Sequence, residues 1–206
     1  MDEKDKQEII NLYEDRLTKH GVSVTTMGWR DREQQALRFK ILSEIGDLQG
    51  KKILDIGCGF GDFYDYLEQN SIYVDYHGID LSEKIIAAAR ERRHDMLVEV
   101  RDILTDGINE RFDYVFESGI LNKRISDNYA YAHEIITAMY RVCNEGIAFN
   151  MVTDYVDYKE DYLYYYSPEK IFSFCKGLSR FVVLRHDYPL YEFTVYMHKN
   201  QQKTYR

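Results

Sequence analysis

Three glycines at alternate positions, Gly57, Gly59 and Gly61, constrain the fold of this chain more than any other feature. They follow a short apolar run that ends in Asp55-Ile56, and an amphipathic segment comes after them. This order predicts a buried strand, a tight turn and the start of a helix. Glycine adopts backbone dihedrals that are closed to other residues, so a ligand can approach such a turn closely. Turns of this kind usually hold part of a nucleotide.

The charges around the turn indicate which ligand it holds. A dinucleotide site has the spacing G-x-G-x-x-G and presents helix-start amides to a pyrophosphate. Here the third glycine comes one residue early, Asp62 stands where that pattern requires glycine, and residues 55–62 contain no Lys or Arg. Carboxylates repel a phosphate but attract an ammonium or a sulfonium group. The sequence therefore favours S-adenosylmethionine, which carries an adenosine, a free amino acid and a positive sulfur.

Three more apolar segments read as strands that end in an acid. An acid at the end of the second strand can accept hydrogen bonds from both ribose hydroxyls. An acid after the third strand can accept from the exocyclic amine of adenine, with Ile103 covering the ring. The segments and their acids are residues 73–80 with Asp80, residues 97–104 with Asp102, and residues 111–119 with Glu117.

Taken together, these motifs resemble those of class I S-adenosylmethionine-dependent methyltransferases, from about residue 30 to the C-terminus. The resemblance implies an α/β fold, a Rossmann-like three-layer sandwich. Its sheet would be mostly parallel and seven-stranded with an antiparallel last strand, and helices would cover both faces. The matching motifs are Asp55-Ile56-Gly57-Cys58-Gly59-Phe60-Gly61, Gly78-Ile79-Asp80-Leu81-Ser82, Arg101-Asp102-Ile103 and Phe112-Asp113-Tyr114-Val115.

The same resemblance implies which residues bind the cofactor. The glycines would line the methionine part, Asp80 the ribose, and Asp102 with Ile103 the adenine. Related enzymes often cover the methionine end with their N-terminal segment, where Arg38 could pair with the free carboxylate. The alternative is that Arg38 is a surface charge and Trp29 a core anchor. The full predicted set is Trp29, Arg38, Asp55, Gly57, Cys58, Gly59, Gly61, Asp80, Leu81, Asp102, Ile103 and Glu117.

We expect one domain with three parts, because 206 residues can bury a single substantial core. Residues 1–50 would form a helical cap over the cofactor site, with helices at 5–20 and 31–45. Strands and helices alternate over 51–150, which implies a parallel sheet covered on both faces. Residues 151–206 would supply a lid loop, a helix and a terminal β pair.

The predicted lid is rich in tyrosine. Residues 154–166 hold six tyrosines and four acids, and they follow the predicted fifth strand. Ligands of open α/β sheets bind at the carboxyl ends of the strands, so this loop stands in the right place to contact an acceptor. Tyr162, Tyr164 and Tyr165 are the candidates for substrate contact. Alternatively, the tyrosines only pack on the sheet.

No catalytic residue can be assigned from the sequence. Methyl transfer is a displacement at a sulfonium carbon, so alignment and desolvation can supply most of the acceleration. A general base is needed only when the acceptor carries a proton of high pKa. The weak candidates are Glu117, His133 and His186. Each has a plainer interpretation, as a cofactor contact, a packed helix residue and a turn residue respectively.

Composition narrows the partners and the compartment. A net charge of −8 disfavours nucleic acid, and no run approaches the length of a membrane helix. The charged N-terminus lacks the apolar core of a signal peptide, and three widely spaced cysteines suggest neither disulfides nor a metal site. We therefore expect a cytoplasmic monomer or homodimer.

The expected function is transfer of a methyl group from S-adenosylmethionine to an O, N or C atom of a small molecule, with S-adenosylhomocysteine as product. Two alternatives remain open, a protein methyltransferase and a non-catalytic S-adenosylmethionine-binding protein. An NAD-dependent oxidoreductase is disfavoured by Asp62 and by the spacing of the glycines.

Overall fold

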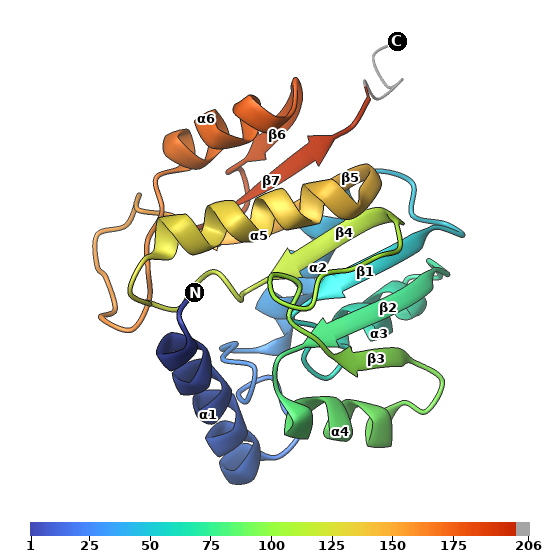
Figure 1. Cartoon of the computed structure of the whole chain (residues 1–206). Coiled ribbons are helices and arrows are strands. Elements are labelled where there is room, and N and C mark those ends of the chain that lie inside the picture. Colours follow the sequence, from blue (N-terminus) through green and yellow to red (C-terminus); the bar gives the residue numbers. More distant parts are fainter. Residues whose placement is uncertain (201–206) are drawn as a thin grey trace.

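A seven-stranded sheet with helices on both faces forms the body of the computed structural model, which describes residues 1–200 (Figure 1). The strand order across the sheet is β3-β2-β1-β4-β5-β7-β6. The strands are β1 (Lys52–Ile56), β2 (Asp75–Asp80), β3 (Leu97–Val100), β4 (Phe112–Ser118), β5 (Cys143–Val152), β6 (Phe181–Arg185) and β7 (Glu192–His198). The helices are α1 (Glu3–His20), α2 (Arg32–Ser43), α3 (Asp62–Gln69), α4 (Glu83–Arg92), α5 (Asn128–Val142) and α6 (Pro168–Leu178).

The strand pairing confirms the predicted fold class. Strands β1 to β5 run parallel, whereas β7 lies between β5 and β6 and is antiparallel to both. The chain leaves β1 toward β2 and β3 on one side, and then crosses to β4 and β5 on the other. The strand order thus reverses between β1 and β4, and open α/β sheets bind ligands at the carboxyl ends of the strands at such a point.

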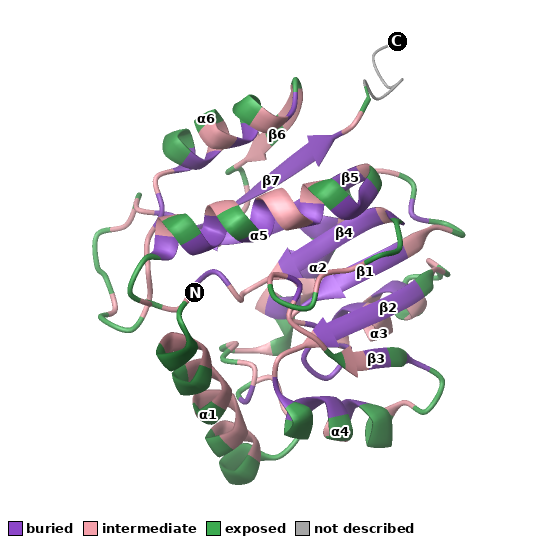
Figure 2. Ribbon diagram, viewed as in Figure 1, coloured by how far each residue is buried: buried purple, intermediate pink, exposed green. Residues whose placement is uncertain are grey.

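The sheet divides the interior into two cores, because successive side chains of a strand point to opposite faces. On β1, Leu54 packs into the core covered by α5 and α6, whereas Ile53 packs into the core with α2, α3 and α4. Figure 2 shows the inner strands of the sheet mostly buried, whereas the edge strands β3 and β6 are partly exposed. Helix α1 has no buried residue and stands apart from both cores.

Five of the six helices begin at a polar side chain that caps them. In each case a side-chain oxygen accepts a hydrogen bond from the backbone N–H three residues later, which satisfies an amide that the helix leaves free. The caps are Asp2, Asp31, Ser82, Asp127 and Ser167. Helix α3 differs, because its cap is Gly61 in a left-handed conformation.

The structure corrects one strand boundary and leaves part of one segment outside its range. The predicted third strand was too long: β3 ends at Val100, so Asp102 lies in the turn beyond it. Residues 201–206, the end of the predicted segment 151–206, lie outside the described residues. Within residues 1–200, no helix is both long and apolar enough to cross a bilayer.

A buried ion pair joins α2 to β7. Arg38 Nε donates to both carboxylate oxygens of Glu192, at 2.9 and 2.8 Å, and both side chains are buried. The Arg38 guanidinium also lies over the Trp29 ring, 4.3 Å from its centroid. Breaking a buried pair leaves one charge without compensation, which is far more costly than losing an exposed pair.

Removing the Glu192 charge should therefore destabilise the fold strongly. We expect Glu192→Gln to lower the free energy of unfolding by about 3–5 kcal/mol, measured by urea denaturation. The control is Glu44→Gln, which removes an exposed pair with Arg185 and should cost about 0–1 kcal/mol. Equal losses in the two variants would show that the Arg38 pair does not hold α2 to the sheet.

Candidate functional site

The turn between β1 and α3 is closed to side chains. Gly57, Gly59 and Gly61 have φ values of 72°, 55° and 80°, a region that L-residues rarely adopt. A Cβ on Gly57 would stand 2.1 Å from Cγ2 of Ile120, and one on Gly59 would stand 2.5 Å from Sδ of Met27. The turn therefore needs glycine both for its backbone and for the close approach of its neighbours.

Asp80 ties the end of β2 to this turn. Its Oδ2 accepts from Gly59 N at 3.1 Å, and its Oδ1 accepts from Ser82 N at 3.0 Å. Loss of solvent raises the pKa of Asp80, while these backbone donors oppose the rise. No cation pairs with this carboxylate within residues 1–200, so its charge is available to a ligand in the cavity.

Two further acids are buried beneath the turn. Burial raises the pKa of Asp55 to about 7, and its Oδ2 accepts from the Tyr76 hydroxyl at 2.7 Å. Burial likewise raises the pKa of Glu117 to about 8. Glu117 Oε1 accepts from Ile120 N at 2.7 Å, whereas its buried Oε2 has no hydrogen-bond partner among the described residues. Glu117 thus holds the turn after β4 from below.

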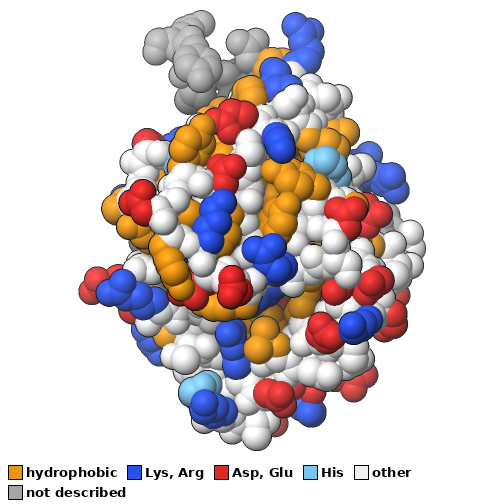
Figure 3. Space-filling view, turned by 90° about the vertical axis from the view of Figure 1, so that its left-hand side faces the viewer, with side chains coloured by type: hydrophobic (Ala, Val, Ile, Leu, Met, Phe, Trp, Pro, Cys, Tyr) orange, Lys and Arg blue, Asp and Glu red, His pale blue; other side chains and the backbone are white. Residues whose placement is uncertain are grey.

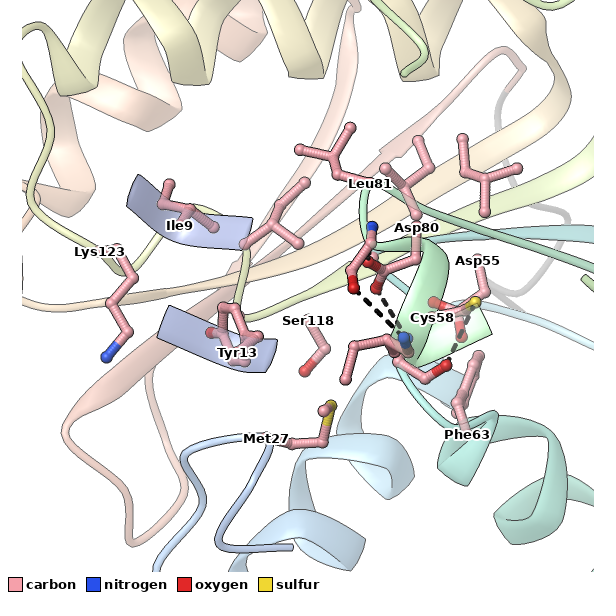
Figure 4. Close-up of a pocket in the computed structure, with 18 of the residues that line it drawn as sticks. Ile9, Tyr13, Met27, Asp55, Cys58, Phe63, Asp80, Leu81, Ser118 and Lys123 are labelled. Carbon is pink, nitrogen blue, oxygen red and sulfur yellow. Dashed lines mark hydrogen bonds between the residues drawn. The ribbon is translucent and has the colours of Figure 1, made fainter. Parts of the chain in front are cut away.

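A cavity opens over the turn at the carboxyl ends of β1, β2 and β4. Its empty volume is about 1130 Å³, counted out to open solvent. Figure 4 shows Ile9 and Tyr13 of α1 between Lys123 on one side and Asp80, Asp55 and Cys58 on the other. Its wall comes from α1, residues 27–29, the glycine turn, residues 79–82, residues 101–103 and the turn at 118–120.

A salt bridge attaches α1 to one end of this cavity. Lys6 Nζ donates to Asp102 Oδ2 at 2.8 Å, and Leu104 N donates to Asp102 Oδ1 at 2.9 Å. Although burial raises it, these donors hold the pKa of Asp102 below its ordinary value. Farther along α1, Glu14 accepts from the Ser82 hydroxyl at 2.9 Å. Helix α1 has no buried residue, so these polar contacts hold it across the cavity.

Known proteins with the same sequence pattern identify the family. A family model for the methyltransferase domain matches residues 54–146. A Mycobacterium tuberculosis protein that is named as a methyltransferase is 35% identical over 154 residues, which cover 71% of this chain and 92% of that protein. The chain belongs to the class I S-adenosylmethionine-dependent methyltransferases. The NAD-dependent alternative is thereby set aside.

More distant methyltransferases share parts of the sequence or the whole fold. A ubiquinone biosynthesis O-methyltransferase of Pseudomonas entomophila is 28% identical over 128 residues, which span 57% of this chain and 54% of that enzyme. The crystal structure of magnesium protoporphyrin IX methyltransferase from Synechocystis PCC 6803 with S-adenosylhomocysteine has a TM-score of 0.71 at 15% identity. The superposed region covers 95% of this chain and 100% of the magnesium protoporphyrin enzyme's chain. The cofactor of this methyltransferase is S-adenosylmethionine, and its product is S-adenosylhomocysteine.

Nine of the twelve predicted cofactor residues line the cavity, and three do not. Gly61 caps α3 behind the wall, and Glu117 lies beneath it. Arg38 does not line the cavity: its Nε and Nη2 donate to Glu192, whereas its buried Nη1 has no partner among the described residues, so its pairing with the cofactor's carboxylate stays a prediction. The nine residues are Trp29, Asp55, Gly57, Cys58, Gly59, Asp80, Leu81, Asp102 and Ile103.

The two histidine candidates lie away from the cavity. The His133 ring stacks on Phe174 of α6, with centroids 3.7 Å apart. The His186 ring lies near Tyr155 and Phe193, beyond the end of β6. Neither histidine lines the cavity, so neither lies where a bound cofactor and acceptor would react. Within residues 1–200, no three metal-ligating side chains gather into a site.

The tyrosine-rich segment, residues 154–166, contacts the cavity wall from behind, through Lys123. Tyr162 contacts Lys123, whose Nζ is 4.6 Å from the ring centroid. Tyr164 packs edge-on against Tyr129, and the Tyr165 hydroxyl accepts from Glu160 N at 2.8 Å. None of these three candidates lines the cavity described here. Lys123 is thus the link between this segment and the site.

Sequence reasoning missed several wall residues. Ile9 and Tyr13 fall on the apolar positions of α1, so the pattern signalled packing but not that the packing surface would be a cavity. Met27 and Lys123 lie in loops and have no motif around them. Only the folded chain brings these loop residues to the glycine turn.

The buried Glu117 should make stability depend on pH. Its folded pKa of about 8 exceeds the ordinary value of 4.5, so the folded chain keeps a proton that the unfolded chain releases. The free energy of unfolding should therefore fall as pH rises from about 5 to 8. Glu117→Gln, which cannot ionise, should flatten this fall in urea denaturation at several pH values. The exposed Glu83→Gln is the control; if both variants keep the wild-type slope, Glu117 is charged in the folded chain.

Proposed function

We propose that this methyltransferase moves a methyl group to an O, N or C atom of a small molecule that enters the cavity beneath α1. The observation that carries this proposal is the cavity itself. Its wall joins the glycine turn and residues 79–82 and 101–103 to α1, residues 118–120 and Lys123, so the motifs expected to hold the cofactor open onto further wall that a small acceptor can contact. Its walls are built from the described residues of this chain.

The cavity residues suggest how the cofactor is held. Asp80 would accept from the ribose hydroxyls; its place in the cavity wall and its two backbone donors, Gly59 N and Ser82 N, support this role. Asp102 and Ile103 would receive the adenine, and Lys6 would give up or share its bond to Asp102 when the base enters. The glycine turn would receive the methionine part, bordered by Ile120 beside Gly57 and by Met27 beside Gly59.

Catalysis in this arrangement rests on alignment and on exclusion of water. The cofactor supplies the electrophilic methyl group, and the chain must place the acceptor atom in line with it. Ile9, Tyr13 and Trp29 cover the cavity with apolar surface, which keeps water from the reacting atoms. No side chain is assigned as a general base, so an acceptor with a readily lost proton, or none to lose, suits the site best.

The named relatives support a small acceptor. Both the ubiquinone biosynthesis enzyme and the magnesium protoporphyrin enzyme act, by their names, on small molecules. A protein acceptor is the second candidate, and it would have to reach the cavity past the latched α1 helix.

Transfer of a labelled methyl group tests this proposal. The protein is incubated with methyl-labelled S-adenosylmethionine and a cell extract separated into small-molecule and protein fractions. We expect label to appear in a new compound of the small-molecule fraction. Label confined to the protein fraction would favour a protein acceptor, and no transfer into either fraction would favour a non-catalytic binding protein.

Replacing Asp80 should weaken cofactor binding. We expect Asp80→Asn to reduce the binding free energy of S-adenosylhomocysteine by about 1.5–3 kcal/mol in isothermal titration calorimetry, the scale for a hydrogen bond to a charged group. Asp75→Asn changes an exposed acid at the other end of β2 and should bind as the wild type does. Unchanged affinity in Asp80→Asn, with an unchanged melting temperature, would remove Asp80 from its ribose role.

A further inference from the structure

Lys123 brings a positive charge to the cavity without a matching acid. It lies at the end of the cavity opposite Asp55 and Cys58 (Figure 4). Within residues 1–200 no carboxylate forms an ion pair with its ammonium, and its recorded contact is the face of the Tyr162 ring. Burial, together with the charge of Arg16, lowers the pKa of Lys123 to about 8. The site is thus short of a negative group.

Arg16 adds a second cation beside it. Its Nη1 is buried and has no hydrogen-bond partner among the described residues. The same Nη1 atom lies against Gly28, 2.8 Å from where a Cβ of that residue would stand. The Cζ atom of Arg16 lies 5.6 Å from the centroid of the Tyr13 ring. Tyr13 and residues 27–29 belong to the cavity wall. Arg16 therefore stands at the rim of the same end as Lys123.

The acids of the cavity do not neutralise this pair. Asp62 is paired with Arg92 at 2.6 Å, and Asp102 is paired with Lys6 at 2.8 Å. The cavity thus has an acidic end whose charges are partly matched and a basic end whose charges are not. Figure 3 faces the side of the molecule where α1 and the tyrosine-rich segment lie, and it shows Lys and Arg side chains interspersed with Asp and Glu around the middle of this face.

Two neighbouring cations that are partly withdrawn from water repel each other and gain from an anion placed between them. A carboxylate or phosphate group provides acceptors for both the Arg fork and the Lys ammonium. Ile9 lies between this end and Asp80, and Ile120 lies beside Gly57, so apolar side chains line the wall on the way to the glycine turn. A ligand that fits has an apolar body and one anionic group.

We propose that Lys123 and Arg16 form an anion subsite, and that the methyl acceptor is a small molecule with an apolar body and a carboxylate or phosphate group. This inference rests on the proposed function, since it names the class of acceptor for the same cavity. The anion would anchor the acceptor at the Lys123 end and direct its body toward the cofactor.

Matched probes test the subsite without knowledge of the natural acceptor. The protein is saturated with S-adenosylhomocysteine and titrated calorimetrically with benzoate, phenyl phosphate and benzamide, a neutral analogue of benzoate. We expect at least one anion to bind about tenfold or more tightly than benzamide, as expected for hydrogen bonds to a charged group. The tighter of the two anions identifies the group as carboxylate or phosphate.

Variants assign that preference to the two cations. Lys123→Met and Arg16→Gln should each bring anion affinity close to that of benzamide, whereas Lys123→Arg should keep the preference. The control Lys159→Met removes an exposed lysine that lies over Tyr165 in the same segment, and it should change nothing. Melting temperatures and S-adenosylhomocysteine affinity show whether each variant is folded and binds cofactor.

Two results would overturn the subsite. One is that wild type binds neither anion better than benzamide; the other is that the preference survives in both Lys123→Met and Arg16→Gln. Failure of the proposed function looks different, because then the wild type would transfer no methyl group to any small molecule even though the anions bind.

Discussion

The hydrogen bond from Gly59 N to Asp80 is the contact on which the site depends, because it joins the glycine turn after β1 to the end of β2. Ile120 and Met27 then close on the glycines so tightly that a single Cβ at Gly57 or Gly59 would collide with them. The same carboxylate faces the cavity, so one group both shapes the turn and presents negative charge to a ligand.

The charges of the cavity are arranged unevenly, with acids at one end and Lys123 at the other. The buried acids at its floor are held by hydrogen bonds from Tyr76 and from the turn after β4, and burial favours their neutral forms. Asp102 is matched by Lys6 of α1. Asp80 therefore remains the carboxylate best able to meet a ligand, whereas Lys123 stands at the far end, where no carboxylate among residues 1–200 forms an ion pair with it. The ribose of the cofactor would lie at the Asp80 end, and an anionic acceptor would lie at the Lys123 end.

Most of the fold could be predicted from the sequence, because the glycines at 57, 59 and 61 and the alternation of strands and helices are local patterns. Asp80 and Asp102 were predicted as the acids of the second and third strands, and both line the cavity. The role of Arg38 could not be predicted, because its partner Glu192 comes from the far end of the chain. Lys123 was missed for the same reason: its position in the cavity depends on how α1 and the loop after β4 meet, which no short pattern encodes.

A crystal structure with bound S-adenosylhomocysteine is the most direct measurement of where the donor lies. We predict that its ribose hydroxyls contact Asp80, that its adenine lies against Ile103, and that its sulfur faces the space between Tyr13 and Lys123. Density for the nucleoside away from Asp80, or a sulfur turned away from that space, would contradict the assignment of both ends of the cavity.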